Sequence, residues 1–217
     1  MQPNSWLHCG SVWLRCPHDT QRCASHRDRR THPPAALLAA ARVEFAANGI
    51  AGGRVDRIAE MSGVNKQRIY AHFGSKERLF DAVVSQALDE MADAVPVTGP
   101  LDDYVGRVFE FHQNNPELLR LFLWESLHYR EEPLPNDEGR ADRYRHKVQA
   151  LAGILGTEPD SDTAGALLLM IGLAAWPLAV TPMTRLVLGA AGEDDVNSVR
   201  GVAAEVVRRA FPAGMRP

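Results

Sequence analysis

The feature that most constrains the fold of this chain is a pair of short helix-forming segments joined by one tight turn, between residues 55 and 73. Val55 and Ile58 have helical spacing in the first segment, and Asn65 is a favourable N-cap for the second. Gly63 supplies the backbone freedom that such a turn needs. The pattern predicts a helix-turn-helix, although an ordinary helical hairpin within a core has the same outline.

The first turn of the second segment carries long hydrogen-bonding side chains and no acid. In a helix-turn-helix, the N-terminal residues of the second helix reach base edges in the major groove. Lys and Arg pair there with guanine, and Gln pairs with adenine. We therefore predict that the bases are contacted by Lys66, Gln67 and Arg68. The contacts to the DNA backbone are predicted to come from the polar residues around this turn, namely Arg54, Asn65, Tyr70, His72 and Lys76.

Charge is divided unevenly along the chain. Residues 1–31 and 32–80 each carry a net charge of +3, whereas residues 81–217 carry −9. A basic front is typical of a part that binds a polyanion. The sequence therefore predicts a helix-turn-helix DNA-binding domain over residues 32–80 and a second domain with a different role over residues 81–217.

Residues 1–31 are predicted to be a disordered basic extension. They contain all three cysteines, which are seven residues apart and form no Cys-x-x-Cys pair, so we expect no metal site and no cofactor. Their apolar run at residues 12–14 is too short for a signal peptide. The absence of cysteine from the rest of the chain fits a reducing compartment, and we expect the protein to be cytoplasmic.

Helical periodicity dominates the remainder, and no segment shows the sustained alternation typical of strands. We expect an all-α fold of about nine helices, with an N-terminal three-helix bundle and a C-terminal helical domain for ligand binding and dimerisation. The long helix over residues 76–94 would connect the two domains. The expected helices span residues 35–47, 55–61, 65–72, 76–94, 101–113, 116–129, 140–155, 162–176 and 194–210, with a short helix near 183–188.

One stretch, residues 163–184, has no charged side chain. Its most apolar part, residues 164–176, would reach about 20 Å as a helix, short of the ~30 Å hydrocarbon core of a bilayer. We expect this helix to be buried between other helices or against a second subunit rather than in a membrane. The predicted dimer interface on this helix and the last one comprises Leu167, Met170, Ile171, Ala174, Val199, Val202 and Val206.

The segment 55–80 resembles the DNA-binding domain of the TetR family of transcriptional regulators. The resemblance covers residues 34–82 and rests on Ile58-Ala59 before the turn and on Tyr70-x-x-Phe73-Gly74-Ser75-Lys76-Glu77-x-Leu79-Phe80 after it. It implies a homodimer that binds a near-palindromic double-stranded DNA operator, as a repressor. It also implies that the C-terminal helices form the dimer and a pocket for a small-molecule effector, whose binding releases the DNA. The chain departs from the family at Gly53 and Arg54, where a capping Thr is usual.

Several large side chains of the C-terminal domain are candidates for that pocket. At helical spacing, residues of this kind also fill ordinary cores, so the two interpretations stay open. The candidates are Leu88, Met91, Phe109, His112, Trp124, His128, Tyr144 and Trp176.

No motif indicates an enzyme. The sequence has no Gly-rich phosphate loop, no Gly-x-Ser-x-Gly elbow and no His-Glu-x-x-His helix. Its acid pairs at residues 131–132 and 194–195 fall in polar, loop-like segments. The alternative that remains beside a DNA-binding regulator is a helical interaction module without sequence-specific DNA binding.

Overall fold

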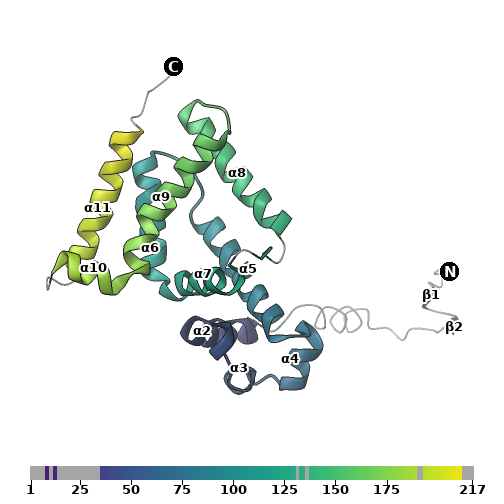
Figure 1. Cartoon of the computed structure of the whole chain (residues 1–217). Helices are drawn as coiled ribbons and strands as arrows, with labels where there is room; N and C mark the ends of the chain where they lie inside the picture. The colour runs from purple at the N-terminus through teal and green to yellow at the C-terminus, as the bar shows by residue number, and fades with distance from the viewer. Residues whose placement is uncertain are drawn as a thin grey trace, which may run out of the picture. The chain divides into compact units, whose positions relative to one another are not determined.

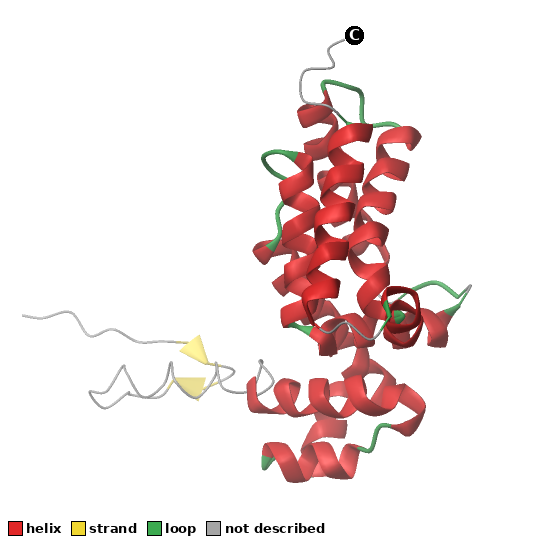
Figure 2. Cartoon of the chain, turned by 90° about the vertical axis from the view of Figure 1, so that its left-hand side faces the viewer, coloured by secondary structure: helices red, strands yellow, loops and turns green. Residues whose placement is uncertain are grey.

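The structure is a computed structural model that describes residues 8–9, 12–13, 35–130, 132–134, 137–189 and 193–211. Two short strands, β1 (His8–Cys9) and β2 (Val12–Trp13), pair antiparallel, with His8 opposite Trp13. The other residues of the predicted disordered extension lie outside the described part. From residue 35 onward, the described residues are helices joined by short loops (Figure 2).

The first four described helices form the predicted helix-turn-helix unit and the helix that leaves it (Figure 1). They are α2 (Ala35–Gly52), α3 (Val55–Ser62), α4 (Lys66–Phe73) and α5 (Lys76–Ala94). α3 ends at Gly63, whose φ of 67° and ψ of 12° lie in the left-handed region that glycine adopts without a steric cost. Asn65 and Ser75 cap α4 and α5 by accepting hydrogen bonds from the backbone N–H groups of Gln67 and Arg78.

Six more helices follow. They are α6 (Leu101–Asn114), α7 (Pro116–Tyr129), α8 (Asp137–Leu155), α9 (Ser161–Ala179), α10 (Thr181–Leu188) and α11 (Glu193–Ala210). α9 packs on α6, α8 and α11, which makes it the central helix of this part (Figure 1). The all-α prediction is confirmed, with ten helices from residue 35 to residue 211.

Three helix ends differ most from the prediction. α2 continues past a kink at Gly49 to Gly52 instead of stopping at residue 47. α8 begins at Asp137, not at residue 140, and α9 runs through Pro177 to Ala179 instead of stopping at Trp176. Pro177 has no N–H for the carbonyl four residues earlier, and α9 ends two residues after it. The Pro177 carbonyl accepts a hydrogen bond of 2.7 Å from the Thr184 hydroxyl of α10, so the end of the helix remains satisfied.

Two apolar clusters hold these helices together. The first joins α2, α3, α4 and the first part of α5, and it also contains Leu118 and Leu121 of α7. Phe45 and Phe80 meet at its centre, edge to face, with ring centroids 5.3 Å apart. The second cluster joins the end of α5 to α6, α8, α9 and α11. α5 contributes to both clusters, so one continuous helix runs from the DNA-binding unit to the C-terminal helices.

Candidate functional site

The first turn of α4 is exposed to solvent. Lys66, Gln67 and Arg68 are all exposed, as the sequence predicts for base readers. The side chain of Asn65 is already used, because its Oδ1 accepts the Gln67 N–H at 2.8 Å. Lys66 is also engaged, through an exposed ion pair of 2.7 Å between its Nζ and Asp56 Oδ1. Of the three predicted readers, Gln67 and Arg68 have no side-chain partner in the described part of the chain.

Four of the predicted contact residues lie around one hollow between the start of α3 and the junction of α4 with α5. This hollow, of about 450 Å³, is lined by Arg54, Lys66, Tyr70 and Lys76 among others. Gln67, Arg68 and His72 do not line it. Asp56 and Glu77 line it too, so its three cations outnumber its acids by one, and a concave site of this kind next to the exposed turn of α4 suits a DNA phosphate.

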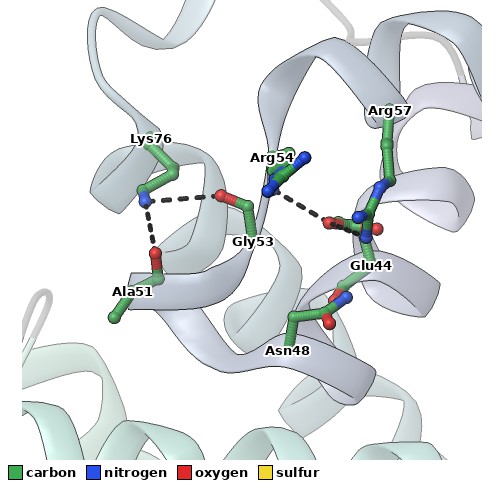
Figure 3. Close-up of polar contacts among 7 residues, drawn as sticks. All are labelled: Glu44, Asn48, Ala51, Gly53, Arg54, Arg57 and Lys76. Carbon is green, nitrogen blue, oxygen red and sulfur yellow. Dashed lines mark hydrogen bonds and ion pairs between the residues drawn. The ribbon is translucent and has the colours of Figure 1, made fainter.

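Lys76 has a structural contact as well. Its ammonium donates to the carbonyl oxygens of Ala51 and Gly53, both at 3.4 Å (Figure 3). These carbonyls close the end of α2, where a cation is favourable. An ammonium has three N–H donors, so one remains for a phosphate after these two bonds.

Glu44 is the residue of this unit that sequence reasoning missed. It is 4% exposed, and its Oε1 accepts the backbone N–H of Arg54 at 2.9 Å and the Arg57 guanidinium at 3.3 Å (Figure 3). Arg54 is the N-cap residue of α3 and makes no side-chain cap of its own. The carboxylate from α2 therefore accepts the N–H of the N-cap residue, as the Glu of a capping box does, and its charge suits a helix N-terminus.

Gly53 is required by packing. A Cβ at this position would lie 2.6 Å from Cδ1 of Phe45 and 2.8 Å from the Gly49 carbonyl oxygen. The glycine allows the chain to pass close to Phe45 before α3 begins, and Glu44 bonds the backbone N–H of the next residue, Arg54.

The C-terminal helices enclose a cavity of about 930 Å³. That volume is within the range of sites that bind drug-sized molecules. Four of the predicted pocket residues line it, namely Leu88, Met91, His112 and Tyr144. Ile171, predicted at the dimer interface, lines the cavity too.

The other four pocket predictions are wrong, because these side chains lie elsewhere. Phe109 is fully buried in the second apolar cluster. Trp124 turns toward α2, where its Nε1 donates to the Ala46 carbonyl at 3.3 Å. His128 is exposed and stacks edge to face on Tyr129, and Trp176 is exposed on α9.

Sequence reasoning also missed a buried ion pair in the cavity wall. Arg140 Nη1 of α8 lies 2.8 Å from Glu125 Oε1 of α7, and both side chains are at most 10% exposed. Burial raises the pKa of Glu125, and the bond to Arg140 offsets part of that rise. The same face of α7 lines the cavity with Leu119, Phe122 and Ser126.

Comparison with known proteins decides the family. Residues 37–83 match the model for bacterial regulatory proteins of the tetR family, and residues 100–209 match the tetracyclin repressor-like, C-terminal domain. The chain belongs to the TetR family of transcriptional regulators. It is therefore a DNA-binding regulator and not an enzyme.

Several TetR-family relatives match most of this chain. The HTH-type transcriptional repressor SCO4008 of Streptomyces coelicolor is 37% identical over 81% of this chain and 95% of its own length. The HTH-type transcriptional regulator RutR of Escherichia coli is 31% identical over 84% of this chain and 90% of its own. The solved structure of the transcriptional regulator SCO4942 of Streptomyces coelicolor matches with a TM-score of 0.66 at 28% identity, and the match covers 86% of this chain and 98% of that one.

The structure corrects the predicted dimer face of this TetR-family chain. Leu167, Met170 and Ala174 are buried within the subunit, so they are not available to a partner. Of the α11 residues, Val199 packs against the same cluster, whereas Val202 and Val206 are exposed, as an interface requires. The exposed apolar residues of α9 and α10 are Leu168, Leu169, Leu173, Trp176, Met183, Leu186 and Val187.

α9 is also the described helix that is long and apolar enough to cross a membrane, with a mean hydropathy of 1.5 over 18 residues. Length and composition of this kind are shared by core helices of soluble proteins. α9 packs on five helices of its own subunit, namely α6, α7, α8, α10 and α11, and its remaining apolar side chains form one outward face.

Proposed function

We propose that this protein is a transcriptional repressor that binds a near-palindromic operator as a homodimer and is released by a small-molecule effector. The observation that carries the proposal is the exposed, acid-free first turn of α4 beside a cationic hollow. Gln67 and Arg68 would read bases, and Arg54, Tyr70 and Lys76 would hold the phosphates. The expected compartment is the cytoplasm, and no membrane or cofactor is required.

The dimer would form through the outward faces of α9 and α11. Leu168 and Leu169 are 71% and 69% exposed, and Val202 is 62% exposed. An exposed apolar patch of this size is typical of a protein–protein interface. A two-fold symmetric dimer is the commonest assembly. Leu169→Glu would place two charges at the two-fold interface and should give monomers. Leu167→Glu would instead unfold the subunit, because Leu167 is buried inside it.

The effector would act through α7. One face of this helix lines the cavity with Phe122 and Glu125, and another carries Trp124 against α2 of the DNA-binding unit. The Tyr129 hydroxyl at the end of α7 also donates to Asp81 Oδ1 of α5 at 2.6 Å. A ligand that shifts α7 would thus change the support of both α2 and α5. Couplings of this kind are typically worth about 1–3 kcal/mol, and they are reciprocal.

The experiment that tests this proposal is footprinting on a genomic fragment selected by the purified protein. We expect a two-fold symmetric footprint that is lost in Leu169→Glu at the same protein concentration. A bulky side chain placed in the cavity by Ala175→Trp should alter operator affinity without touching the DNA surface. An asymmetric footprint that survives Leu169→Glu would contradict the dimer. Binding to all duplexes alike would favour the helical interaction module.

A further inference from the structure

The wall of the cavity contains polar groups that the protein itself does not satisfy. Three buried side-chain nitrogen or oxygen atoms of the described residues lack a hydrogen-bond partner, and two of them belong to cavity residues. These are Nδ1 of His112 and Nε of Arg140; the third is the Tyr104 hydroxyl. Buried polar groups are nearly always paired, and leaving one unpaired is costly. Neither atom is accessible to solvent, so both lie behind the cavity surface and show only that the wall is polar there.

The charges around the cavity are mostly paired. Glu125 pairs with Arg140, Asp142 pairs with Arg145, and Arg143 pairs with Asp89 outside the cavity. Glu138, at the start of α8, is exposed to solvent. Glu138 and Lys147 are the two exceptions, because neither has a charged partner in the described part of the chain, and of the two only Lys147 is half-buried.

The pKa values of Lys147 and His112 are both lowered, mainly by burial and further by neighbouring positive charge. Burial lowers the pKa of Lys147, and the neighbouring charge of Arg143 lowers it further. Burial also lowers the pKa of His112 to about 4, and the charge of Lys147 adds to that effect. The half-buried ammonium of Lys147 therefore lacks a compensating negative charge, which an anionic ligand would supply.

We infer that the effector of this cavity is an organic anion, with one acidic group on an apolar body. The acidic group would lie beside the half-buried ammonium of Lys147, and the body would lie against the apolar wall formed by Leu88, Met91, Leu119, Phe122 and Ile171. This inference rests on the proposed function, since it names the ligand class of the same effector site.

The alternatives fit the same wall less well. A cation would be placed beside Lys147. The carboxylates of Glu125 and Asp142 are already held by arginines, and the third carboxylate of the wall, Glu138, is exposed to solvent. A neutral ligand would remove water from Lys147 without compensating its charge, which is unfavourable. An anion compensates that charge and also accepts hydrogen bonds.

The test uses matched probes on the full-length protein. Isothermal titration calorimetry would compare decanoate, decan-1-ol and decylammonium, and then 1-naphthoate with 1-naphthylmethylammonium as a second apolar body. We expect the carboxylate of each set to bind at least about tenfold more tightly than its uncharged or cationic match, since hydrogen bonds to charged groups have about that effect. Lys147→Met should remove this preference, and Lys147→Arg should retain it. Arg120→Met is the control, because Arg120 is an exposed cation of α7 outside the cavity wall.

The outcomes separate this inference from the proposed function. Equal or tighter binding of the uncharged or cationic probes, or no binding of either carboxylate, would overturn the anion assignment. A carboxylate preference that persists in Lys147→Met would overturn it as well. Operator binding is measured separately on the protein without any probe. If the protein binds an operator but shows no preference for carboxylate probes, only the ligand class is refuted. If it prefers carboxylate probes but binds no operator, the proposed function is refuted.

Discussion

The indole ring of Trp124 packs directly on the backbone of Gly49. A Cβ at Gly49 would lie 2.8 Å from both Cδ2 and Cε3 of the indole, and Trp124 Nε1 donates to the Ala46 carbonyl one turn earlier in α2. Gly49 has a φ of 66° and a ψ of −174°, a conformation that is essentially restricted to glycine. The kink in α2 and the ring of Trp124 therefore fit together, and they join the DNA-binding unit to the helix that lines the cavity of the C-terminal helices.

Gly49→Ala is predicted to destabilise the protein by at least roughly 1–3 kcal/mol, because backbone strain and a clash with Trp124 act together. In a Trp124→Ala background the same substitution should cost less, since only the backbone strain remains. Gly156→Ala is the control, because its φ is also positive but nothing lies within 4 Å of the added Cβ. Urea unfolding of the four variants of the cycle measures the coupling. Additive effects of Gly49→Ala and Trp124→Ala would show that the two residues do not interact.

Glu44→Gln is predicted to reduce the free energy of unfolding by about 1–2 kcal/mol, since it removes the charge that caps α3 and pairs with Arg57. The matched control is Glu90→Gln. Glu90 pairs with Arg42 at 2.5 Å but is 40% exposed, so its loss should cost less than about 1 kcal/mol. Equal costs for the two substitutions, measured by thermal or urea unfolding, would refute the capping role of Glu44.

Asp56→Asn is predicted to strengthen DNA binding for all sequences by a few-fold. The substitution frees the ammonium of Lys66 and removes a negative charge from the edge of the phosphate hollow. The control is Asp93→Asn, which removes an exposed acid near the far end of α5. Fluorescence anisotropy at several salt concentrations measures the effect. Weaker binding in Asp56→Asn would indicate that the ion pair holds Lys66 in its DNA-contacting position.

The buried imidazole of His112 should make the protein less stable in mild acid. Its pKa is about 4 in the folded state and about 6.5 in an unfolded chain, so the unfolded state binds more protons between these values. The free energy of unfolding therefore falls as the pH is lowered from 6.5 toward 4, by at most about 1.4 kcal/mol per pH unit from this group. The groups that face it include the rings of Phe111 and Phe122 and the charge of Lys147.

His112→Leu tests that prediction by denaturant unfolding at pH 7 and pH 5, at one protein concentration. The loss of stability between the two pH values should be smaller in the variant, by up to about 2 kcal/mol. His146→Leu, which removes an exposed imidazole from α8, serves as the control. An unchanged pH dependence in His112→Leu would show that His112 is not the group that titrates.

Local signals in the sequence predicted much of this fold. Ser75 caps the start of α5 and Gly63 adopts the left-handed conformation that ends α3, so the residue type at each position sets a helix end. The predicted helix 76–94 begins and ends as expected. The solvent exposure of Lys66, Gln67 and Arg68 in the first turn of α4 was also predictable, since these polar side chains have no apolar surface to cover. Glu44 was not predictable, because its partner is a backbone N–H that only the folded contact of α2 with α3 brings near.

Which side chains face a partner subunit and which line the pocket depends on tertiary packing, so sequence periodicity alone could not assign them. α9 is apolar around its whole circumference, so periodicity alone does not say that Leu167 faces inward and Leu168 outward. Trp124 likewise has no local signal for its partner, which is the backbone of a distant helix. The charged residues of the cavity wall were missed because Arg140 and Lys147 have the spacing of an ordinary solvent-exposed helix face. Only the folded structure places them near Glu125 of α7 and His112 of α6.

The most direct test of the account is the affinity of the purified protein for a selected operator and for a scrambled duplex of the same composition, measured across 50–200 mM salt. We predict that the operator binds at least about a hundredfold more tightly, that both affinities fall with salt, and that Gln67→Ala with Arg68→Ala removes most of the preference. Equal affinity for operator and scrambled duplex, or a preference unchanged by the double substitution, would contradict DNA reading by the first turn of α4.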